Sequence, residues 1–259
     1  MFKVLNMDAH TFKFNSASSS DLITIYENAT DAEIRAAEEQ AKHRTFAPSS
    51  FRCKRLNWFR LRGVLPDKID VTDPVLDFSA KIGTACHELI QSRLQRALGD
   101  DWISVEDYFK LNPPEFQYIL EAKGYETFVE ILDPPVRFAC DGIIRLNGKI
   151  YLIEIKSSEY ASFNELMQPK PYHVDQVKCY SSLLNISDVL MIYIDRQYGS
   201  LKCFETNIPL SDMLQVRNDI KVVQRAVETN IAPDGLPVGD PWCRSNMCPY
   251  YKVCKEWGR

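Results

Sequence analysis

The sequence predicts a mixed α/β fold, with one central sheet flanked by helices, and three observations lead to this prediction. Apolar segments that alternate like strands are interleaved with segments that have the apolar period of helices. Asn147-Gly148 joins two such strand segments, and this dipeptide is the strongest short signal for a two-residue hairpin turn. With 259 residues, 45% hydrophobic and 25% charged, the chain has the composition of a globular protein and the length for a substantial core.

Each element has its own signal in the residue pattern. Apolar periodicity and capping residues predict helices that begin near Thr30 and after Ser211, and helices over 51–63, 76–98 and 172–184. Alternating or β-branched segments predict strands within 1–20 and over 125–132, 135–146, 149–158, 189–195 and 201–208. We expect residues 1–50 to form an N-terminal extension and residues 51–259 to form the main domain.

Composition and local sequence argue against several classes of protein. No run of about 18 apolar residues occurs, so a membrane span is not expected. The first residues lack the apolar region of a secretory signal. Eight cysteines in a chain of this length, without such a signal, indicate reduced thiols in a cytoplasm rather than a disulfide framework. The net charge of −4 neither favours nor excludes nucleic acid, because binding depends on where the cations lie.

The predicted hairpin brings two carboxylates together. Leu146 faces Lys149 across the turn, and counting back along both strands places Asp141 opposite Glu154, with Cβ atoms roughly 4.5–5.5 Å apart. Lys156 lies two residues beyond Glu154 and therefore on the same face. Facing carboxylates repel each other, and Mg²⁺ or Mn²⁺ would offset the repulsion, activate a water and stabilise charge on a phosphoryl group, while Lys156 orients that water or neutralises the developing charge. The alternative is a solvated strand face with incidental charges.

Three cysteines lie close together near the C-terminus, at Cys243, Cys248 and Cys254. Such spacing in a reduced compartment indicates metal ligation. Three thiolates leave a tetrahedral set incomplete, and Cys53 in the helix over 51–63 is the best candidate for the fourth. The remaining cysteines fall within predicted elements, and we expect them to be buried as small hydrophobic residues: Cys86, Cys140, Cys179 and Cys203.

The helix over 51–63 combines cations with aromatic rings. Its candidate nucleic-acid contacts are Arg52, Lys54, Arg55, Trp58 and Arg60. This combination suits single-stranded nucleic acid, because cations follow the phosphates and rings stack on the bases. The alternative is a structural helix whose aromatic residues face the core and whose cysteine anchors it to the metal centre.

Four motifs occur in a consistent order: Gly83-Thr-Ala-Cys-His87, Asp141-Gly142, Glu154-Ile-Lys156 and Gln176-Val-Lys-Cys-Tyr180. Together they resemble the RecB-like branch of the PD-(D/E)XK nuclease superfamily. The resemblance implies a restriction-endonuclease-like core with Lys156 as the catalytic lysine. It implies metal ligation by His87, Asp141, Glu154 and the backbone carbonyl of Ile155. Gln176 and Tyr180 would support the site or contact the substrate strand. Taken alone, a histidine such as His87 beside an apolar helix face is more often structural, and it is the other motifs that favour a ligand here.

One early and three late cysteines around such a core resemble the iron–sulfur nucleases, which include CRISPR-associated nucleases and AddB-type nuclease domains. The resemblance implies a 4Fe–4S cluster that joins the N-terminal helix to the C-terminal tail. Zinc is the alternative, because it also accepts four thiolates. The first gap in the tail, four residues between Cys243 and Cys248, departs from the two-residue gap that is commoner in that family.

These resemblances imply a Mg²⁺- or Mn²⁺-dependent deoxyribonuclease, expected to act as an exonuclease on single-stranded DNA in replication, recombination or repair. The chain lacks a P-loop motif, so any unwinding would come from a helicase or recombination partner. A compact nuclease of this kind fits a prokaryotic or phage-infected cytoplasm. Two alternatives are a non-catalytic DNA-binding adaptor subunit of a recombination or CRISPR adaptation complex, and a zinc-stabilised structural protein.

Overall fold

The computed structural model describes residues 21–30, 32, 45–67, 74–237, 239–244 and 247–257. Two compact units divide the chain, one comprising residues 1–42 and 70–78, the other residues 43–69 and 79–259. In the first unit, residues 21–30 are helical, and the Thr30 hydroxyl donates to the carbonyl oxygen of Tyr26 at 3.0 Å. Thr30 therefore lies inside a helix rather than capping one. The strand expected within residues 1–20 lies outside the described residues.

The second unit is built around two sheets. The larger has the strand order β1 (Trp102–Ile103), β5 (Gly142–Leu146), β6 (Lys149–Ser158), β7 (Asp188–Asp195) and β8 (Leu201–Asn207). Adjacent strands of this sheet are antiparallel, except that β6 and β7 run parallel. The smaller antiparallel sheet has the order β2 (Tyr118–Lys123), β3 (Glu126–Ile131) and β4 (Val136–Phe138). The expected mixed central sheet is therefore confirmed.

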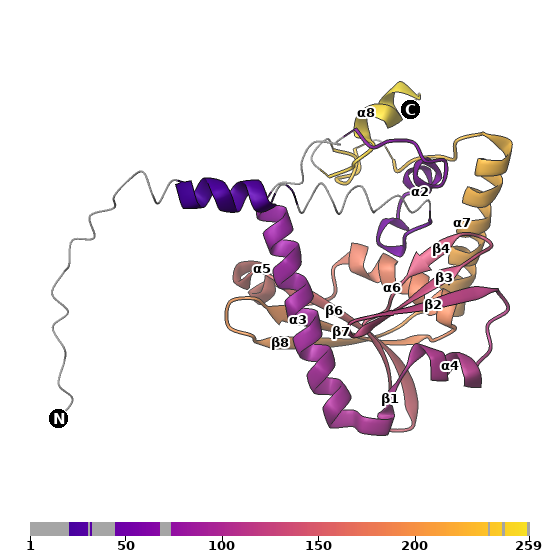
Figure 1. The fold of residues 1–259 in the computed structure, drawn as a ribbon. Coiled ribbons are helices and arrows are strands. Elements are labelled where there is room, and N and C mark those ends of the chain that lie inside the picture. Colours follow the sequence, from indigo (N-terminus) through magenta and orange to yellow (C-terminus); the bar gives the residue numbers. More distant parts are fainter. Residues whose placement is uncertain are drawn as a thin grey trace, which may run out of the picture. The chain divides into compact units, whose positions relative to one another are not determined.

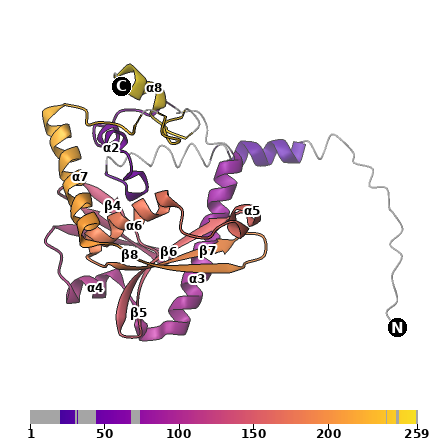
Figure 2. The same cartoon turned by 180° about the vertical axis from the view of Figure 1, so that it is seen from behind.

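Helices cover both faces of the larger sheet (Figures 1 and 2). From Ser79 onward, α3 (Pro74–Leu98) packs on one face, where Ile90 meets apolar residues of β5, β6 and β7. The opposite face meets α6 (Pro171–Leu184) and α7 (Leu210–Thr229). The shorter helices are η1 (Pro48–Ser50), α2 (Lys54–Leu61), η2 (Gly99–Asp101), α4 (Val105–Leu111), α5 (Tyr160–Asn164) and α8 (Tyr251–Glu256).

The hairpin between β5 and β6 has the predicted register. Asn147 and Gly148 both have positive φ, 51° and 78°, as a two-residue type I′ turn requires. Leu146 pairs with Lys149, and the pairing continues to Gly142 opposite Ile153. Four apolar residues of the hairpin share one face and pack beneath α3: Ile144, Tyr151, Ile153 and Ile155.

Other expectations need correction. The segment expected as one strand over 135–146 divides into β4 and β5, with a bend at Asp141. Ser211 does not cap α7, because that helix begins at Leu210 with Pro209 as its N-cap. Phe46, which precedes the proposed boundary at residue 50, is 1% exposed and forms a parallel bridge with Val136. Within the described part of the chain, no helix has the length and apolar character to span a membrane.

Candidate active site

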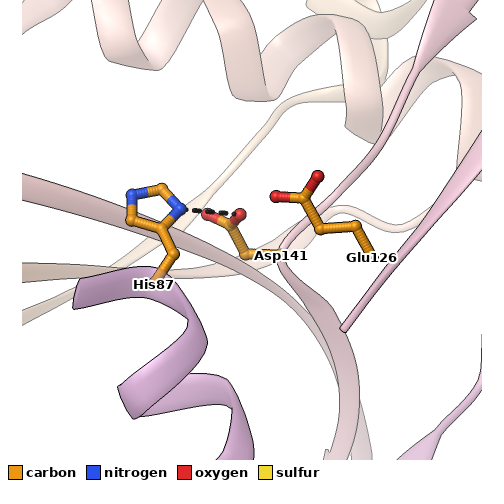
Figure 3. A group of neighbouring side chains, drawn as sticks. All are labelled: His87, Glu126 and Asp141. Atoms are coloured by element: carbon orange, nitrogen blue, oxygen red, sulfur yellow. Dashed lines mark hydrogen bonds and ion pairs between the residues drawn. The ribbon is translucent and has the colours of Figure 1, made fainter. Parts of the chain in front are cut away.

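Three side chains that suit a metal ion converge from separate elements. His87 lies on α3, Glu126 begins β3, and Asp141 occupies the bend directly before β5. One ligand atom from each residue lies within 4.8 Å of the others. Figure 3 shows the His87 ring and the Glu126 carboxylate on either side of Asp141. The three residues therefore form one candidate metal centre.

Asp141 is held in place by contacts on both its side chain and its backbone. Its carboxylate accepts a hydrogen bond from the backbone N–H of Ile155 and lies 3.1 Å from Nδ1 of His87. Nε2 of Gln91 donates to the Asp141 carbonyl oxygen at 2.8 Å, and the Gln91 side chain is 1% exposed. Such contacts orient a metal ligand before the metal arrives. Gln91 follows His87 by one helical turn, so α3 supplies both residues from one face.

The second carboxylate of the motif lies in the middle of β6 and is fully enclosed. Glu154 is 2% exposed, and Nζ of Lys156 forms an ion pair with its Oε1. A buried ion pair of this kind contributes little net stability, since desolvation of both charges offsets their attraction. Perturbed carboxyl–lysine pairs of this kind occur preferentially at functional sites.

The pKa values show that negative charge is crowded here. Burial raises the pKa of Glu154, and although Lys156 lowers it, Asp141 adds to the rise, so the net shift is upward. Burial and then the charge of Asp141 raise the pKa of Glu126. Burial lowers the pKa of His87, but the hydrogen bond and charge of Asp141 outweigh that effect, and the net shift is upward. All three pKa values are raised, so each group holds a proton more readily than it would in water. A bound cation would neutralise the same negative charge without a proton.

The donor set fits a divalent cation that prefers oxygen ligands. Two carboxylates and one imidazole nitrogen gather within 4.8 Å of one another, a set that accommodates Mn²⁺ or Mg²⁺ with waters and substrate oxygens completing the shell. Gly83 permits α3 to approach β6, because a Cβ at this position would lie 3.2 Å from Oγ of Ser157. Packing therefore explains the glycine of the first motif. Gly83 lets the helix that carries His87 lie close to the strand that carries Glu154.

The residues of the fourth motif lie on α6. Nε2 of Gln176 donates to the Tyr180 hydroxyl at 2.6 Å, and Tyr180 is 5% exposed. Burial raises the pKa of Tyr180 well above its ordinary value, and the charges of Glu154 and Asp141 add to the rise. Gln176 and Tyr180 therefore form a hydrogen-bonded pair on α6.

The four candidate cysteine ligands come together. They border a common cavity of about 230 Å³: Cys53, Cys243, Cys248 and Cys254. Burial raises the pKa of the Cys248 thiol to about 11, and the other three cysteines contribute to that rise. The guanidinium of Arg55 donates to Sγ of Cys254 at 3.8 Å. Metal ligation by these four thiols stays a prediction.

Other contacts fasten the segment around Cys53 to the C-terminal tail. The Asp67 carboxylate accepts hydrogen bonds from the backbone N–H groups of Lys252 and Val253, the latter at 2.8 Å. Arg52 pairs with Asp240 at 3.0 Å. Aromatic contacts add to these links, with ring centroids 5.1 Å apart for Trp58–Trp257 and 5.3 Å apart for Phe59–Tyr250. Protein contacts alone thus bring these distant parts of the chain together.

The structure does not leave Trp58 available for base stacking. Its side chain is 0% exposed, and its Nε1–H donates to the carbonyl oxygen of Ala226 at 3.0 Å. The cations around it have protein partners, because Arg52 pairs with Asp240 and Lys54 pairs with Asp219 at 3.2 Å. The prediction that Trp58 stacks on bases is therefore wrong. Trp58 is buried because α2 packs against α7, and this packing directs the aromatic residues of α2 into the core.

Comparison with known proteins gives structural similarities alone, because no family model and no curated protein matches the sequence. SSO0001 is similar over 89% of this chain and 96% of its own, with 16% identity and a TM-score of 0.46. The LHK-Exo complex with dAMP covers 74% of this chain and 91% of its own, with 14% identity and a TM-score of 0.46. A second structure of LHK-Exo, an alkaline exonuclease from Laribacter hongkongensis, covers 74% and 92%, with 14% identity and a TM-score of 0.39.

Two residues of the site were not found from the sequence. Glu126 belongs to no motif, and only the smaller sheet brings it beside Asp141. Gln91 had one available signal, because it follows His87 by four residues on the same helix. Polar residues in that relation on an otherwise apolar helix face indicate a shared role, although they do not show which backbone group the second one contacts.

Proposed function

We propose that this chain is a divalent-cation-dependent nuclease that hydrolyses DNA phosphodiester bonds, acting as an exonuclease on single strands. The observation that carries the proposal is the convergence of His87, Glu126 and Asp141, together with the buried Glu154–Lys156 pair on the adjoining hairpin strand. Carboxylates that hold a cation next to a lysine suit a reaction in which negative charge develops on a phosphoryl group.

In this proposal, His87, Glu126 and Asp141 hold Mn²⁺ or Mg²⁺, with Glu154 and the carbonyl of Ile155 completing the protein ligands. The cation supplies Lewis-acid chemistry at the phosphate and lowers the pKa of a water. Gln91 and the Ile155 N–H keep Asp141 in position while the charge around it changes.

Lys156 acts as the positive group beside the reacting phosphate. Burial lowers the pKa of Lys156, but the charges of Glu154 and Asp141 outweigh this effect and leave the pKa raised, so the ammonium group stays protonated. A fixed ammonium group stabilises the charge that develops on the phosphoryl oxygens or orients the attacking water. Gln176 and Tyr180 support this side of the site.

DNA is the proposed partner, with phosphate contacts from four cations in or just before α2: Arg52, Lys54, Arg55 and Arg60. Arg52 and Lys54 would exchange their aspartate partners for phosphates. Their aromatic neighbour Trp58 takes no part, because it is buried. We further propose that a helicase or recombination partner delivers single strands, in a prokaryotic or phage-infected cytoplasm.

DNA cleavage is expected to require a divalent metal ion. Anaerobically purified protein should shorten end-labelled single-stranded DNA in Mn²⁺ or Mg²⁺ and leave it intact in EDTA, because the cation would neutralise the crowded carboxylates and polarise the phosphate. Denaturing gels of the labelled strand measure this result and give the polarity. Intact DNA in both metals, with well-folded protein, would favour the non-catalytic adaptor instead.

We also propose that the four cysteines bind a 4Fe–4S cluster that joins α2 to the tail, with zinc as the alternative. Supporting observations are the common cavity of about 230 Å³ and the Arg55 donor at Cys254. A structural metal here would add binding energy to folding, in the region already fastened by Asp67 and Arg52.

Replacing Cys248 with Ser is expected to remove the metal and destabilise the tail. Iron, sulfide and zinc analysis, with visible absorbance, should show about four irons per chain in the parent protein and a large loss in the variant. Cys203→Ser is the matched control, because Cys203 lies on β8 away from the quartet. Equal metal content in both variants would contradict the assignment, and a colourless parent with one zinc would select the alternative.

A further inference from the structure

His173 lies on α6 one turn before Gln176, and its ring is partly buried between two tyrosines. Ring centroids are 4.3 Å apart for Tyr172–His173 and 5.6 Å apart for His173–Tyr193. Tyr193 is 0% exposed and stands next to Lys156 in the parallel pairing of β6 and β7. This arrangement puts His173 on the side of the candidate active site where Lys156 lies.

The hydrogen bonds around Tyr193 fix which ring nitrogen of His173 carries the proton. The backbone N–H of Lys170 lies 3.1 Å from the Tyr193 hydroxyl oxygen and can only donate, so the oxygen accepts there. Among the described residues, the one remaining partner of that hydroxyl is Nδ1 of His173, at 2.8 Å. If the oxygen accepted there as well, the hydrogen of this buried hydroxyl would lack an acceptor among the described residues, so the hydroxyl is assigned as the donor to Nδ1. A neutral ring that accepts at Nδ1 carries its hydrogen at Nε2.

The surroundings keep this ring neutral. Burial lowers the pKa of His173 to about 3, and the charges of Lys156 and Lys170 contribute. Burial likewise raises the pKa of Tyr193 to about 12, so the hydroxyl keeps the proton that it donates. A second cation beside Lys156 would be costly, whereas a neutral N–H adds a donor without adding charge. Neutral imidazoles serve as hydrogen-bond donors to substrate oxygens in other enzymes.

We propose that His173 is a neutral hydrogen-bond donor to substrate, whose Nε2–H binds a phosphate oxygen of the DNA strand beside Lys156. This inference rests on the proposed nuclease function and adds a substrate contact to it. Nε2 has no partner among the described residues and is not enclosed, so it is available to a ligand. Tyr193 acts as the positioning residue, because its hydroxyl selects the tautomer that donates at Nε2.

Two substitutions of His173 separate donation from packing. In His173→Gln the side-chain amide N–H occupies about the place of Nε2, whereas in His173→Asn it lies near Nδ1. We expect His173→Asn to lower kcat/KM on single-stranded DNA by about 10- to 100-fold, the usual effect of losing a hydrogen bond to a charged group. His173→Gln should recover most of that loss. Equal activity of both variants and the parent protein would overturn the proposal, and so would equal losses in the two variants.

The tautomer of His173 can be tested independently of DNA cleavage, by ¹⁵N NMR. The sequence has four histidines, so ¹⁵N spectra of histidine-labelled protein are simple, and His173→Gln assigns the signal. At pH 7 we expect a neutral ring protonated at Nε2, and Tyr193→Phe should turn it into a mixture of tautomers. A ring protonated at Nδ1, or a charged ring, would overturn the inference. If the parent protein leaves DNA intact while the spectra are as expected, the nuclease function fails and the substrate contact fails with it, but the tautomer assignment stands.

Discussion

Replacing Asp141 with Asn is expected to reduce DNA cleavage by about 10³-fold or more. The change keeps the size of the side chain but removes the charge at the centre of the His87–Glu126–Asp141 group. A cation in such a site supplies several kcal/mol of transition-state stabilisation, and about 4 kcal/mol corresponds to about 10³-fold in rate. Initial rates on end-labelled single-stranded DNA over a range of Mn²⁺ concentrations measure the loss.

The matched control is Asp101→Asn. Asp101 is an exposed carboxylate on η2 that pairs with Arg145 at 3.4 Å, and its loss should leave cleavage within about twofold. Glu126→Gln should fall between the two variants and require more Mn²⁺ for half-maximal rate, because it removes one ligand of the group and leaves Asp141 in place. Parent-like cleavage by Asp141→Asn, with the fold retained, would contradict the site assignment.

Much of the larger sheet was predictable because its signals are local. The Asn147-Gly148 turn sets the register of β5 and β6, and the register sets which residues share a face. The pairing of Gly142 with Ile153 therefore follows from two residues of the turn. Helices α3 and α6 were predictable for the same reason, since their apolar period is visible within the sequence itself.

The smaller sheet was not predictable in full, and Glu126 was missed with it. Strand β2 reads Tyr-Ile-Leu-Glu-Ala-Lys and is largely exposed, so it lacks the alternation that marks a half-buried strand. It pairs with β3 across the two-residue turn Gly124-Tyr125, so this contact is local. The position of Glu126 beside Asp141 depends instead on how the smaller sheet packs against the larger one, which the local sequence does not specify.

The helix that contains Trp58 shows a different limit of sequence reasoning. Interleaved cations and aromatic rings predict either a DNA-binding face or a buried face, because the residue pattern does not state what lies opposite. The deciding contact is the hydrogen bond from the Trp58 indole to the carbonyl oxygen of Ala226, a residue 168 positions away. Only packing against α7 distinguishes the two interpretations.

Replacing Lys156 with Met is expected to lower cleavage by roughly 10²–10³-fold, the usual effect of losing a group that stabilises transition-state charge. Lys149→Met is the matched control, since Lys149 lies on the same strand with its side chain 58% exposed. Met retains most of the aliphatic length of Lys156, so the packing around β6 changes little. Rates for both variants on the same labelled strand measure the difference, and parent-like cleavage by Lys156→Met would remove this lysine from the mechanism.

Thermal unfolding of the same variant separates the loss of catalysis from the loss of the site. Without Lys156, the 2%-exposed Glu154 has lost its ion-pair partner. The raised pKa of Glu154 lets it take up a proton, so the destabilisation should be smaller than the about 3–5 kcal/mol that a stranded buried charge costs. Mn²⁺ should still raise the Tm, because the cation replaces the missing positive charge and its proposed ligands His87, Glu126 and Asp141 remain. A variant that has lost both cleavage and this response would mean that Lys156 holds the site together rather than acting on the substrate.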